Sequence, residues 1–216
     1  MMKIKMFRQL IIGSLFSVLF SASTNANLIV NGGFEDALTG GTTVNSVVGW
    51  YSSSNVPGWS GSNIELWGNY GLTSQEGSYH AELNASNSGQ PANPGPWSIS
   101  QTFATTAGQR YDLTFAYSGS TGSLTPTESF KVTVDTLEST VGGHLTGAWS
   151  LYFNSFIADG DFATLMFTSV TPANSYSGNL LDNIVVTAST AAVPEPGSLA
   201  LLALGLFGLA AGRRKA

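Results

Sequence analysis

The chain of 216 residues contains no cysteine, and only 10% of its residues are charged. Without cysteine there is no disulfide, no thiol nucleophile and none of the cysteine spacing that marks a zinc site. Basic side chains are scarcest between residues 27 and 192, where Arg110 and Lys131 face twelve acidic residues and give a net charge of −10. Such a surface repels nucleic acid and attracts divalent cations, so we expect no nucleic-acid partner.

Residues 1–26 have the pattern of a secretory signal peptide. A positive n-region is followed by an apolar stretch that is short for a membrane span, and small residues lead to a cleavage site after Ala26. Ala22 is a second candidate for the cleavage site, and a permanent N-terminal anchor is the alternative interpretation.

The last residues, 193–216, form a tail of three parts. An extended segment with two prolines precedes an apolar run at about 198–212, and arginines follow it. The run would be roughly 22 Å long as a helix at 1.5 Å per residue, which is short for a hydrocarbon core of about 30 Å. We expect a transmembrane segment that anchors the chain transiently, with an ordinary tail anchor as the alternative. The residues of the motif are Pro194, Glu195, Pro196, Arg213 and Arg214.

This tail resembles the PEP-CTERM sorting signal of exported bacterial proteins. The resemblance implies recognition by a membrane-embedded exosortase and an association with exopolysaccharide and biofilm. We therefore expect the protein to visit the inner membrane transiently and then to reach the cell surface or the extracellular matrix.

Between the two ends, residues 27–192 have the two-residue periodicity of β-strands. Tyr111, Leu113 and Phe115 alternate with polar or small residues, and turn residues separate such runs. Many short alternating strands indicate an all-β sandwich in one domain. The predicted strands are Leu28–Asn31, Val44–Trp50, Ile64–Trp67, Tyr79–Leu83, Trp97–Phe103, Tyr111–Tyr117, Phe130–Val134, Trp149–Ala158, Phe162–Thr168 and Leu180–Thr187.

The ends of this domain carry a second resemblance. The domain opens with N-G-G-F-E at residues 31–35 and closes with L-D-N-I-V-V at residues 181–186. This is similar to the galactose-binding-like jelly rolls, notably carbohydrate-binding modules. The resemblance implies a jelly-roll β-sandwich and binding of an extracellular polysaccharide.

The two end motifs also suggest a metal site. The two-residue alternation places Asp182 and Ile184 on the same face of the strand. If that face is the core, the unpaired Asp182 carboxylate needs a cation or several hydrogen-bond donors. In the modules that the chain resembles, the N-terminal Glu and the C-terminal Asp share a structural calcium with backbone carbonyls. Carried over, the resemblance implicates Glu35 and Asp182, with carbonyls near Asn31 or Gly33. A carboxylate hydrogen-bonded at a strand end is the alternative.

Aromatic side chains are the candidates for sugar binding, since the apolar face of a sugar ring stacks on an indole. In the strand alternation, Trp67 falls on the opposite face from Ile64 and Leu66, and it precedes a loop that contains Tyr70. Trp97 follows a Pro-rich loop. Glu65 could accept hydrogen bonds from sugar hydroxyls nearby. The predicted glycan site therefore comprises Trp67, Trp97, Tyr70 and Glu65, although most tryptophans of a sandwich are core residues.

Catalysis has little support in the sequence. Two histidines, no phosphate loop and no nucleophile elbow argue against an enzyme, although Glu65 and Glu82 could act as glycosidase carboxylates if their strands brought them together. We expect an exported, non-catalytic, glycan-binding surface or matrix protein. A purely structural or adhesive surface protein and a small glycan-active hydrolase or lyase are the alternatives.

Overall fold

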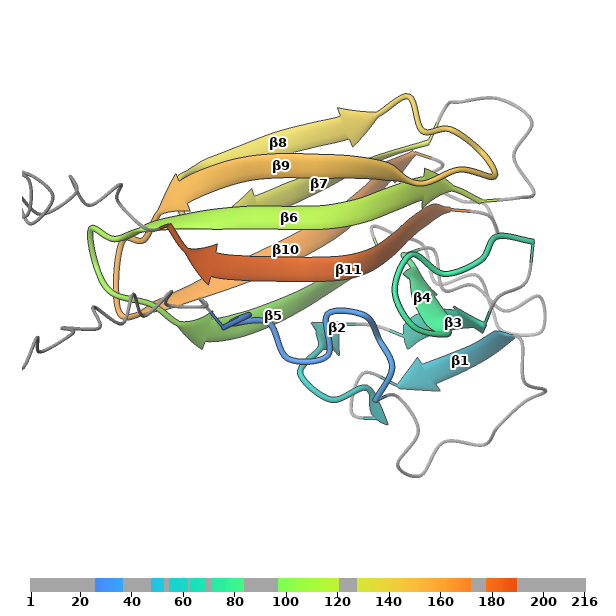
Figure 1. The fold of residues 1–216 in the computed structure, drawn as a ribbon, viewed down its shortest axis with the longest axis horizontal. Coiled ribbons are helices and arrows are strands. Elements are labelled where there is room, and N and C mark those ends of the chain that lie inside the picture. Colours follow the sequence, from blue (N-terminus) through green and yellow to red (C-terminus); the bar gives the residue numbers. More distant parts are fainter. Residues whose placement is uncertain are drawn as a thin grey trace, which may run out of the picture.

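The computed structural model describes residues 26–36, 48–52, 55–61, 63–68, 71–83, 97–120, 128–171 and 178–189. Within these residues all regular structure is β (Figure 1). The strands are β1 (Val48–Ser52), β2 (Ser60–Gly61), β3 (Asn63–Gly68), β4 (Tyr79–Glu82), β5 (Ser98–Ala104), β6 (Arg110–Gly119), β7 (Ser129–Val134), β8 (Leu137–Gly142), β9 (Ser150–Ile157), β10 (Phe162–Thr171) and β11 (Asn179–Ala188).

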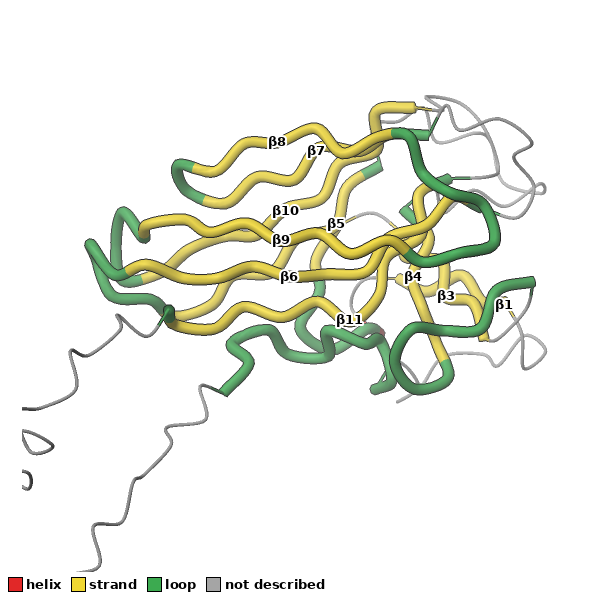
Figure 2. The backbone as a smooth tube through the Cα atoms, turned by 45° about the horizontal axis from the view of Figure 1, so that its top comes forward, coloured by secondary structure: helices red, strands yellow, loops and turns green. Residues whose placement is uncertain are grey.

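The strands form two packed sheets (Figure 2). The six-stranded sheet has the order β1-β3-β4-β11-β6-β9, and the five-stranded sheet has the order β2-β5-β10-β7-β8. Among the described strands the chain crosses between the sheets at every connection except those from β3 to β4 and from β7 to β8, which is the connectivity of a jelly roll. The predicted all-β jelly-roll sandwich is therefore confirmed.

The core lies between the two sheets and follows the alternation of the sequence. On β7, Phe130, Val132 and Val134 are buried, while the residues between them face outward. Phe115 of β6 is at the centre of an aromatic cluster, with its ring centroid 4.5 Å from that of Tyr152 and 5.8 Å from that of Phe130. The alternation of apolar and polar residues thus places apolar side chains on the inner face of each sheet, and their burial holds the two sheets together.

The strand prediction is wrong at Leu28–Asn31, where the chain forms turns. The Val30 amide donates to Gln101 Oε1 at 2.6 Å, and Gln101 Nε2 donates to the Val30 carbonyl at 2.9 Å. One side chain thus satisfies the backbone groups that a neighbouring strand would otherwise pair. Asn31 adopts a φ of 54°, which also ends any extended conformation.

Two strands are absent from the prediction. β2 has only two residues. β8 reads Leu-Glu-Ser-Thr-Val-Gly and has polar residues at both parities, so periodicity cannot identify it. It forms because the turn at Asp135, with a φ of 45°, folds the chain back onto β7.

Several predictions fall on residues outside the described ranges: the signal peptide, the C-terminal sorting motif with its transmembrane segment, and Tyr70. Among the residues that are described, none lies in a helix of the length and hydropathy that a membrane crossing requires.

The aromatic centre of the core gives a stability prediction. Phe115→Ala should lower the free energy of unfolding by about 3–5 kcal/mol, because it removes a fully buried ring from a packed cluster. Phe153 of β9 is 70% exposed and provides the matched control. Phe153→Ala should change the free energy of unfolding by about 0.5 kcal/mol or less in the same urea titration. Equal losses in the two variants would show that the centre of the core lies elsewhere.

Candidate functional site

Strand β11 contains a β-bulge next to the predicted metal ligand. Its pairing with β6 shifts by one residue between Asp182 and Val185, and Asn183 adopts a φ of 48°. Asp182 pairs with Ala116, which faces away from the core, whereas Ile184 lies in the core. The prediction that Asp182 shares the face of Ile184 is therefore wrong, because the extra residue of the bulge reverses the alternation.

Asp182 is nevertheless 0% exposed, because the segment 75–79 covers it on the outer face of the sheet. Its Oδ2 accepts hydrogen bonds from the amides of Gln75 at 2.7 Å and Glu76 at 3.0 Å, and Oδ1 accepts one from the Asn183 amide at 2.6 Å. Burial raises the pKa of Asp182 to about 7, although these hydrogen bonds act in the opposite direction.

Glu35 binds the other end of the same segment. Its Oε1 accepts hydrogen bonds from the amides of Ser78 and Tyr79, each at 2.7 Å. Carboxylates from the beginning and the end of the domain therefore hold consecutive amides of one loop. Glu35 and Asp182 therefore bind one common segment, 75–79, which lies between them in the sequence.

The glycines of the opening motif have steric roles. A Cβ on Gly32 would lie 2.1 Å from the Ile184 carbonyl oxygen, and a Cβ on Gly33 would lie 1.8 Å from Glu76 Oε2. Phe34 follows with a φ of 60° and is fully buried against Trp59, with ring centroids 5.3 Å apart. The motif thus packs the N-terminal loop against β11 and leaves room for the Glu76 carboxylate.

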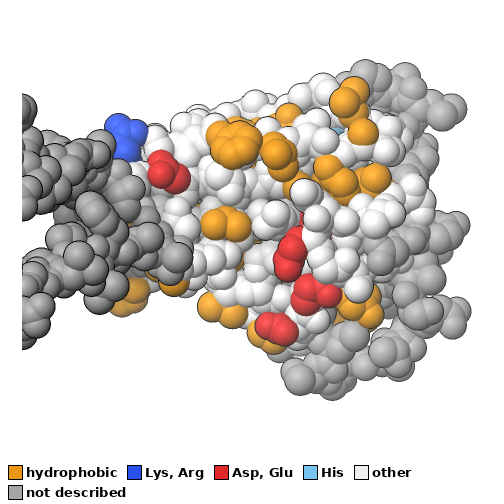
Figure 3. Space-filling view, viewed as in Figure 1, with side chains coloured by type: hydrophobic (Ala, Val, Ile, Leu, Met, Phe, Trp, Pro, Cys, Tyr) orange, Lys and Arg blue, Asp and Glu red, His pale blue; other side chains and the backbone are white. Residues whose placement is uncertain are grey.

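The donor set around this loop fits a hard cation in part. Glu35 and Asp182 bind the segment 75–79, which itself contains Glu76, and Figure 3 shows acidic side chains close together on one face of the molecule. Within the described ranges, however, no three His, Cys, Asp or Glu side chains are close enough to share one metal ion. Backbone or water oxygens would have to complete the coordination shell of a calcium ion.

One of the predicted carbonyl ligands needs a correction. The Asn31 carbonyl accepts hydrogen bonds from the Trp59 indole N–H at 2.9 Å and from the Phe34 amide at 3.2 Å. Both of its lone pairs are therefore used within the protein. A side chain on Gly33 would collide with the Glu76 carboxylate, and the ligand role of the Gly33 carbonyl stays a prediction.

The strands β3 and β4 bring the remaining sequence candidates to one place. Glu65 pairs with Glu82, and Trp67 pairs with His80, all on the face opposite the core residue Ala81. Glu65 and Glu82 are 3% and 1% exposed, so these carboxylates are adjacent but do not face an open cleft. Burial, followed by the charge of Glu65, raises the pKa of Glu82 well above its ordinary value.

His80 also belongs to this buried layer. It is 0% exposed, and its Nδ1 lies 3.0 Å from Ser74 Oγ. Burial lowers the pKa of His80 to about 4, so the imidazole is neutral at neutral pH. His80 packs edge-on against Trp149, whose indole N–H donates to the Thr73 carbonyl at 2.7 Å. These contacts give His80 a structural role.

Of the predicted glycan residues that the structure describes, Trp67, Trp97 and Glu65, none is exposed. Trp97 is 3% exposed and Glu65 is 3% exposed, which corrects the expectation that they contact a sugar. Trp67 is half-buried. Trp97 precedes β5, which pairs with β10 in the same sheet, and the Ser169 amide donates to the Trp97 carbonyl at 2.9 Å.

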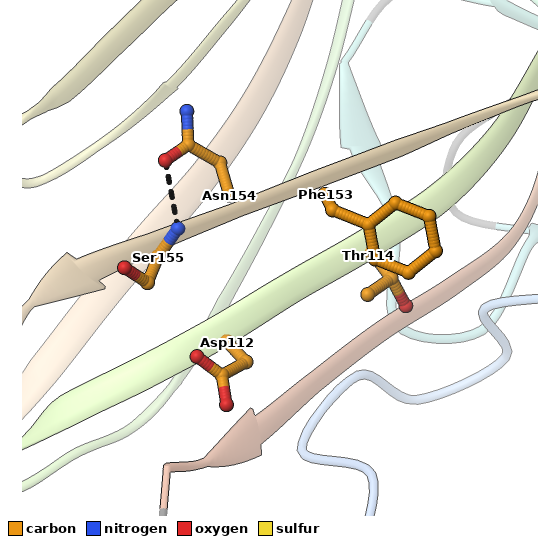
Figure 4. Close-up of a pocket in the computed structure, with 5 residues that line it drawn as sticks. All are labelled: Asp112, Thr114, Phe153, Asn154 and Ser155. Atoms are coloured by element: carbon orange, nitrogen blue, oxygen red, sulfur yellow. Dashed lines mark hydrogen bonds between the residues drawn. The ribbon is translucent and has the colours of Figure 1, made fainter.

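An exposed aromatic side chain lies instead on β9. Phe153 is 70% exposed on the outer face of the six-stranded sheet, opposite Thr114 of β6. Figure 3 shows hydrophobic side chains over these two strands. Around Phe153 is an open hollow of about 300 Å³, lined by Asp112, Thr114, Phe153, Asn154 and Ser155 (Figure 4).

The polar lining of this hollow is ordered. The Ser155 amide donates to Asn154 Oδ1 at 2.8 Å, and Asn154 Nδ2 donates to the Tyr152 hydroxyl at 3.0 Å. Asp112 is exposed beside Ser155. Sequence reasoning missed this hollow because β9 is apolar at both parities, so the pattern does not say which aromatic residue faces outward.

Comparison with known proteins gives two family matches. Residues 192–215 match the PEP-CTERM protein-sorting motif, which indicates an exported protein. Among curated proteins, halomucin from Haloquadratum walsbyi (strain DSM 16790 / HBSQ001) is 30% identical over 182 residues, which is 80% of this chain. The chain spans 2% of the length of halomucin.

Solved structures with a similar fold include carbohydrate-binding modules. One is TmCBM61 in complex with β-1,4-galactotriose, with 16% identity, a TM-score of 0.45 and coverage of 76% of this chain and 99% of that chain. Another is the CBM22-1 xylan-binding domain of Xyn10C from Paenibacillus barcinonensis, with 15% identity, a TM-score of 0.42 and coverage of 74% and 94%. These likenesses do not identify a ligand for this chain.

The second family match covers almost the whole sandwich and ends within β11. It extends over residues 27–187 and is described as "Protein of unknown function (DUF642)". The chain therefore belongs to the DUF642 family.

Proposed function

We propose that this protein is an exported, non-catalytic glycan-binding protein, and that the hollow around Phe153 holds the sugar. The observation that carries the proposal is the exposed aromatic ring with polar side chains beside it on an otherwise ordered sheet face. An exposed aromatic ring gains free energy when a ligand removes it from water.

The chemistry of the hollow suits a sugar. The C–H face of a pyranose can cover the Phe153 ring, and the sugar hydroxyls then lie at the rim of the ring. Asp112 offers a carboxylate that accepts hydrogen bonds, and the Thr114 hydroxyl can both donate and accept, whereas the Asn154 amide is already bonded to Ser155 and Tyr152. The hollow is open to solvent along the sheet, which suits a chain polysaccharide better than an enclosed small molecule.

The sorting motif supports a destination outside the cytoplasm. We place the protein at the cell surface or in an exopolysaccharide matrix such as a biofilm, after processing by an exosortase-type enzyme at the membrane. A glycan-active enzyme is the weaker alternative, because the adjacent carboxylates Glu65 and Glu82 are buried. A purely structural or adhesive protein would leave the Phe153 hollow without a ligand.

The glycan proposal is tested by a pair of matched variants. Phe153→Ala should abolish retention of the protein on the polysaccharides that retain the wild type in affinity electrophoresis, because it removes the stacking surface. Phe162→Ala is the control, since Phe162 is 69% exposed on β10 of the other sheet. Neither change should alter the melting temperature appreciably. Equal binding by the wild type and Phe153→Ala, or no binding by the wild type across a broad glycan panel, would contradict the proposal.

Calcium binding at the loop 75–79 is the second part of the proposal. Glu35 and Asp182 would hold the ion together with backbone or water oxygens, and its charge would offset carboxylates whose hydrogen bonds in the described part of the chain come from backbone amides. Hard oxygen donors favour calcium over zinc. When bound, the ion would supply structural cross-linking of the two ends of the domain.

Calcium should therefore raise the melting temperature, and a chelator should lower it by about 5–10 °C. This follows from roughly 2.7 kcal/mol for a ligand at 100 times its dissociation constant and about 2–4 °C per kcal/mol. Asp182→Asn should abolish the response. An unchanged melting curve in excess chelator, together with no calcium in elemental analysis, would contradict the site.

The response to calcium should also depend on pH. The pKa of Asp182 is raised to about 7 in the folded protein, above its ordinary value of 3.8. The folded state therefore keeps this proton to higher pH than the unfolded state, and the metal-free stability contributed by Asp182 falls as the pH rises from about 4 to about 7. Calcium competes with the proton, so its stabilising effect should be larger at pH 8 than at pH 5. The same pH series on Asp182→Asn measures the contributions of the other buried groups, so the difference between the two proteins gives the contribution of Asp182.

A further inference from the structure

Two buried carboxyl groups lie side by side on the outer face of the six-stranded sheet. Glu65 of β3 and Glu82 of β4 are directly opposite each other in the antiparallel register, and they are 3% and 1% exposed. Side chains in such a pair have Cβ atoms about 4.5–5.5 Å apart, and like charges in these positions destabilise the pairing. Two ionised groups here would therefore repel each other without the screening that water provides.

Glu128, which directly precedes β7, is a third buried carboxyl close enough for its charge to act on Glu82. It is 2% exposed, and its Oε2 accepts a hydrogen bond from the Ser120 amide at 2.9 Å. Glu82 Oε1 accepts one from the Gly178 amide. In the described part of the structure, Glu128 Oε1 and Glu82 Oε2 have no hydrogen-bond partner. Each group thus has one oxygen that can hold a proton without displacing an amide.

The basic side chains of the domain are engaged elsewhere. The two basic and twelve acidic residues of 27–192 all lie in the described ranges. Arg110 donates to Ser155 Oγ of β9, and Lys131 of β7 is paired with Glu138 of β8 at 2.6 Å. A proton or a cation from solution must therefore neutralise the buried carboxyls. No three described His, Cys, Asp or Glu side chains could hold a metal ion together, which favours the proton.

The other neighbours of the pair supply no positive charge. The residues opposite the pair on the flanking strands are Trp50 of β1 and Leu180 of β11. His80, two residues before Glu82 on the same face of β4, is neutral at neutral pH because burial lowers its pKa to about 4. Asp182, two residues after Leu180 on β11, adds negative charge when it is ionised.

The pKa values of these carboxyl groups are raised in the folded protein. For Glu82 burial is the largest cause, the charge of Glu65 is the next, and the charge of Glu128 adds to them. Burial raises the pKa of Glu128 to about 7. A carboxyl of this kind contributes stability that is complete below its ordinary pKa of 4.5. That stability is lost as the pH rises through the folded-state value.

Strand β3 is attached to the rest of its sheet through β4. The order β1-β3-β4 places β1 at the edge, and the pairing of β3 with β4 comprises four residue pairs, of which Glu65 and Glu82 are one. We propose that Glu65 and Glu82 form a pH-sensitive switch, in which a proton held by the pair keeps β3 paired with β4 and loss of that proton as the pH rises releases the β1–β3 edge.

The open form of this switch is a minor state. Release of β3 removes Ile64 and Leu66 from the core, so the closed form stays the more stable one and only the population of the open form depends on pH. The order of the sheet places the switch at the opposite edge from the hollow around Phe153. It therefore does not depend on what the hollow binds.

Native-state hydrogen exchange of the full chain tests the switch, in mild detergent with excess chelator, between about pH 5 and about pH 7. The protection factors of the β3 and β4 amides should fall by up to about tenfold per pH unit, because each opening releases one proton. Glu65→Gln combined with Glu82→Gln should remove most of this fall, since an amide does not titrate. Glu138→Gln combined with Asp159→Asn changes two exposed carboxylates and should leave the fall as it is in the wild type.

Infrared spectroscopy of the wild type provides a second measurement that needs no variant. A protonated carboxyl absorbs separately from a carboxylate, so the spectrum at about pH 6 should contain a band from protonated carboxyl groups. Protection of β3 and β4 that does not change with pH would overturn the proposal. So would a pH dependence that the double Gln substitution leaves unchanged, or a spectrum without the protonated band.

Discussion

Two carboxylates from opposite ends of the domain hold one loop, and the arrangement of the chain ends depends on this interaction. Asp182 accepts the amides of Gln75 and Glu76, and Glu35 accepts those of Ser78 and Tyr79. The loop covers the outer face of β11 where the bulge turns Asp182 away from the core. Burying a carboxylate is costly, and charge-assisted hydrogen bonds from ordered amides offset part of that cost.

The fold could be predicted because its signal is repeated along the chain. Alternation over ten-residue strands such as β6 and β10 determines which side chains enter the core, and a few errors at strand ends do not change the result. The bulge at Asn183 could not be predicted, since it depends on one residue with a positive φ. That single residue reverses the face of Asp182, so Asp182 lies on the opposite side of the sheet from the one that the alternation predicts.

The candidate binding surface was harder to predict than the fold. Trp97 follows a loop-like sequence yet is buried, and Glu65 is polar yet is buried. Burial of an individual side chain depends on contacts with segments far away in the sequence, and the periodicity of a strand carries no information about those contacts. Phe153 is exposed for the converse reason: its strand has aromatic residues at both parities, and only the packing of Tyr152 on Phe115 decides that Phe153 faces outward. The outer face of β6 and β9 then combines an ordered backbone with exposed apolar surface, and we assign the functional interactions to that region.

The central claim is that Asp182 and Glu35 hold the loop 75–79 onto the sandwich. Native-state hydrogen exchange in the Asp182→Ala variant tests it most directly. Loss of hydrogen bonds to a charged group costs about 1.5–3 kcal/mol, so the Gln75 and Glu76 amides should exchange roughly 10- to 100-fold faster. The amides of β6 and β7 should retain their protection. Unchanged exchange at Gln75 and Glu76 would contradict the account, because the loop would then be held by other contacts.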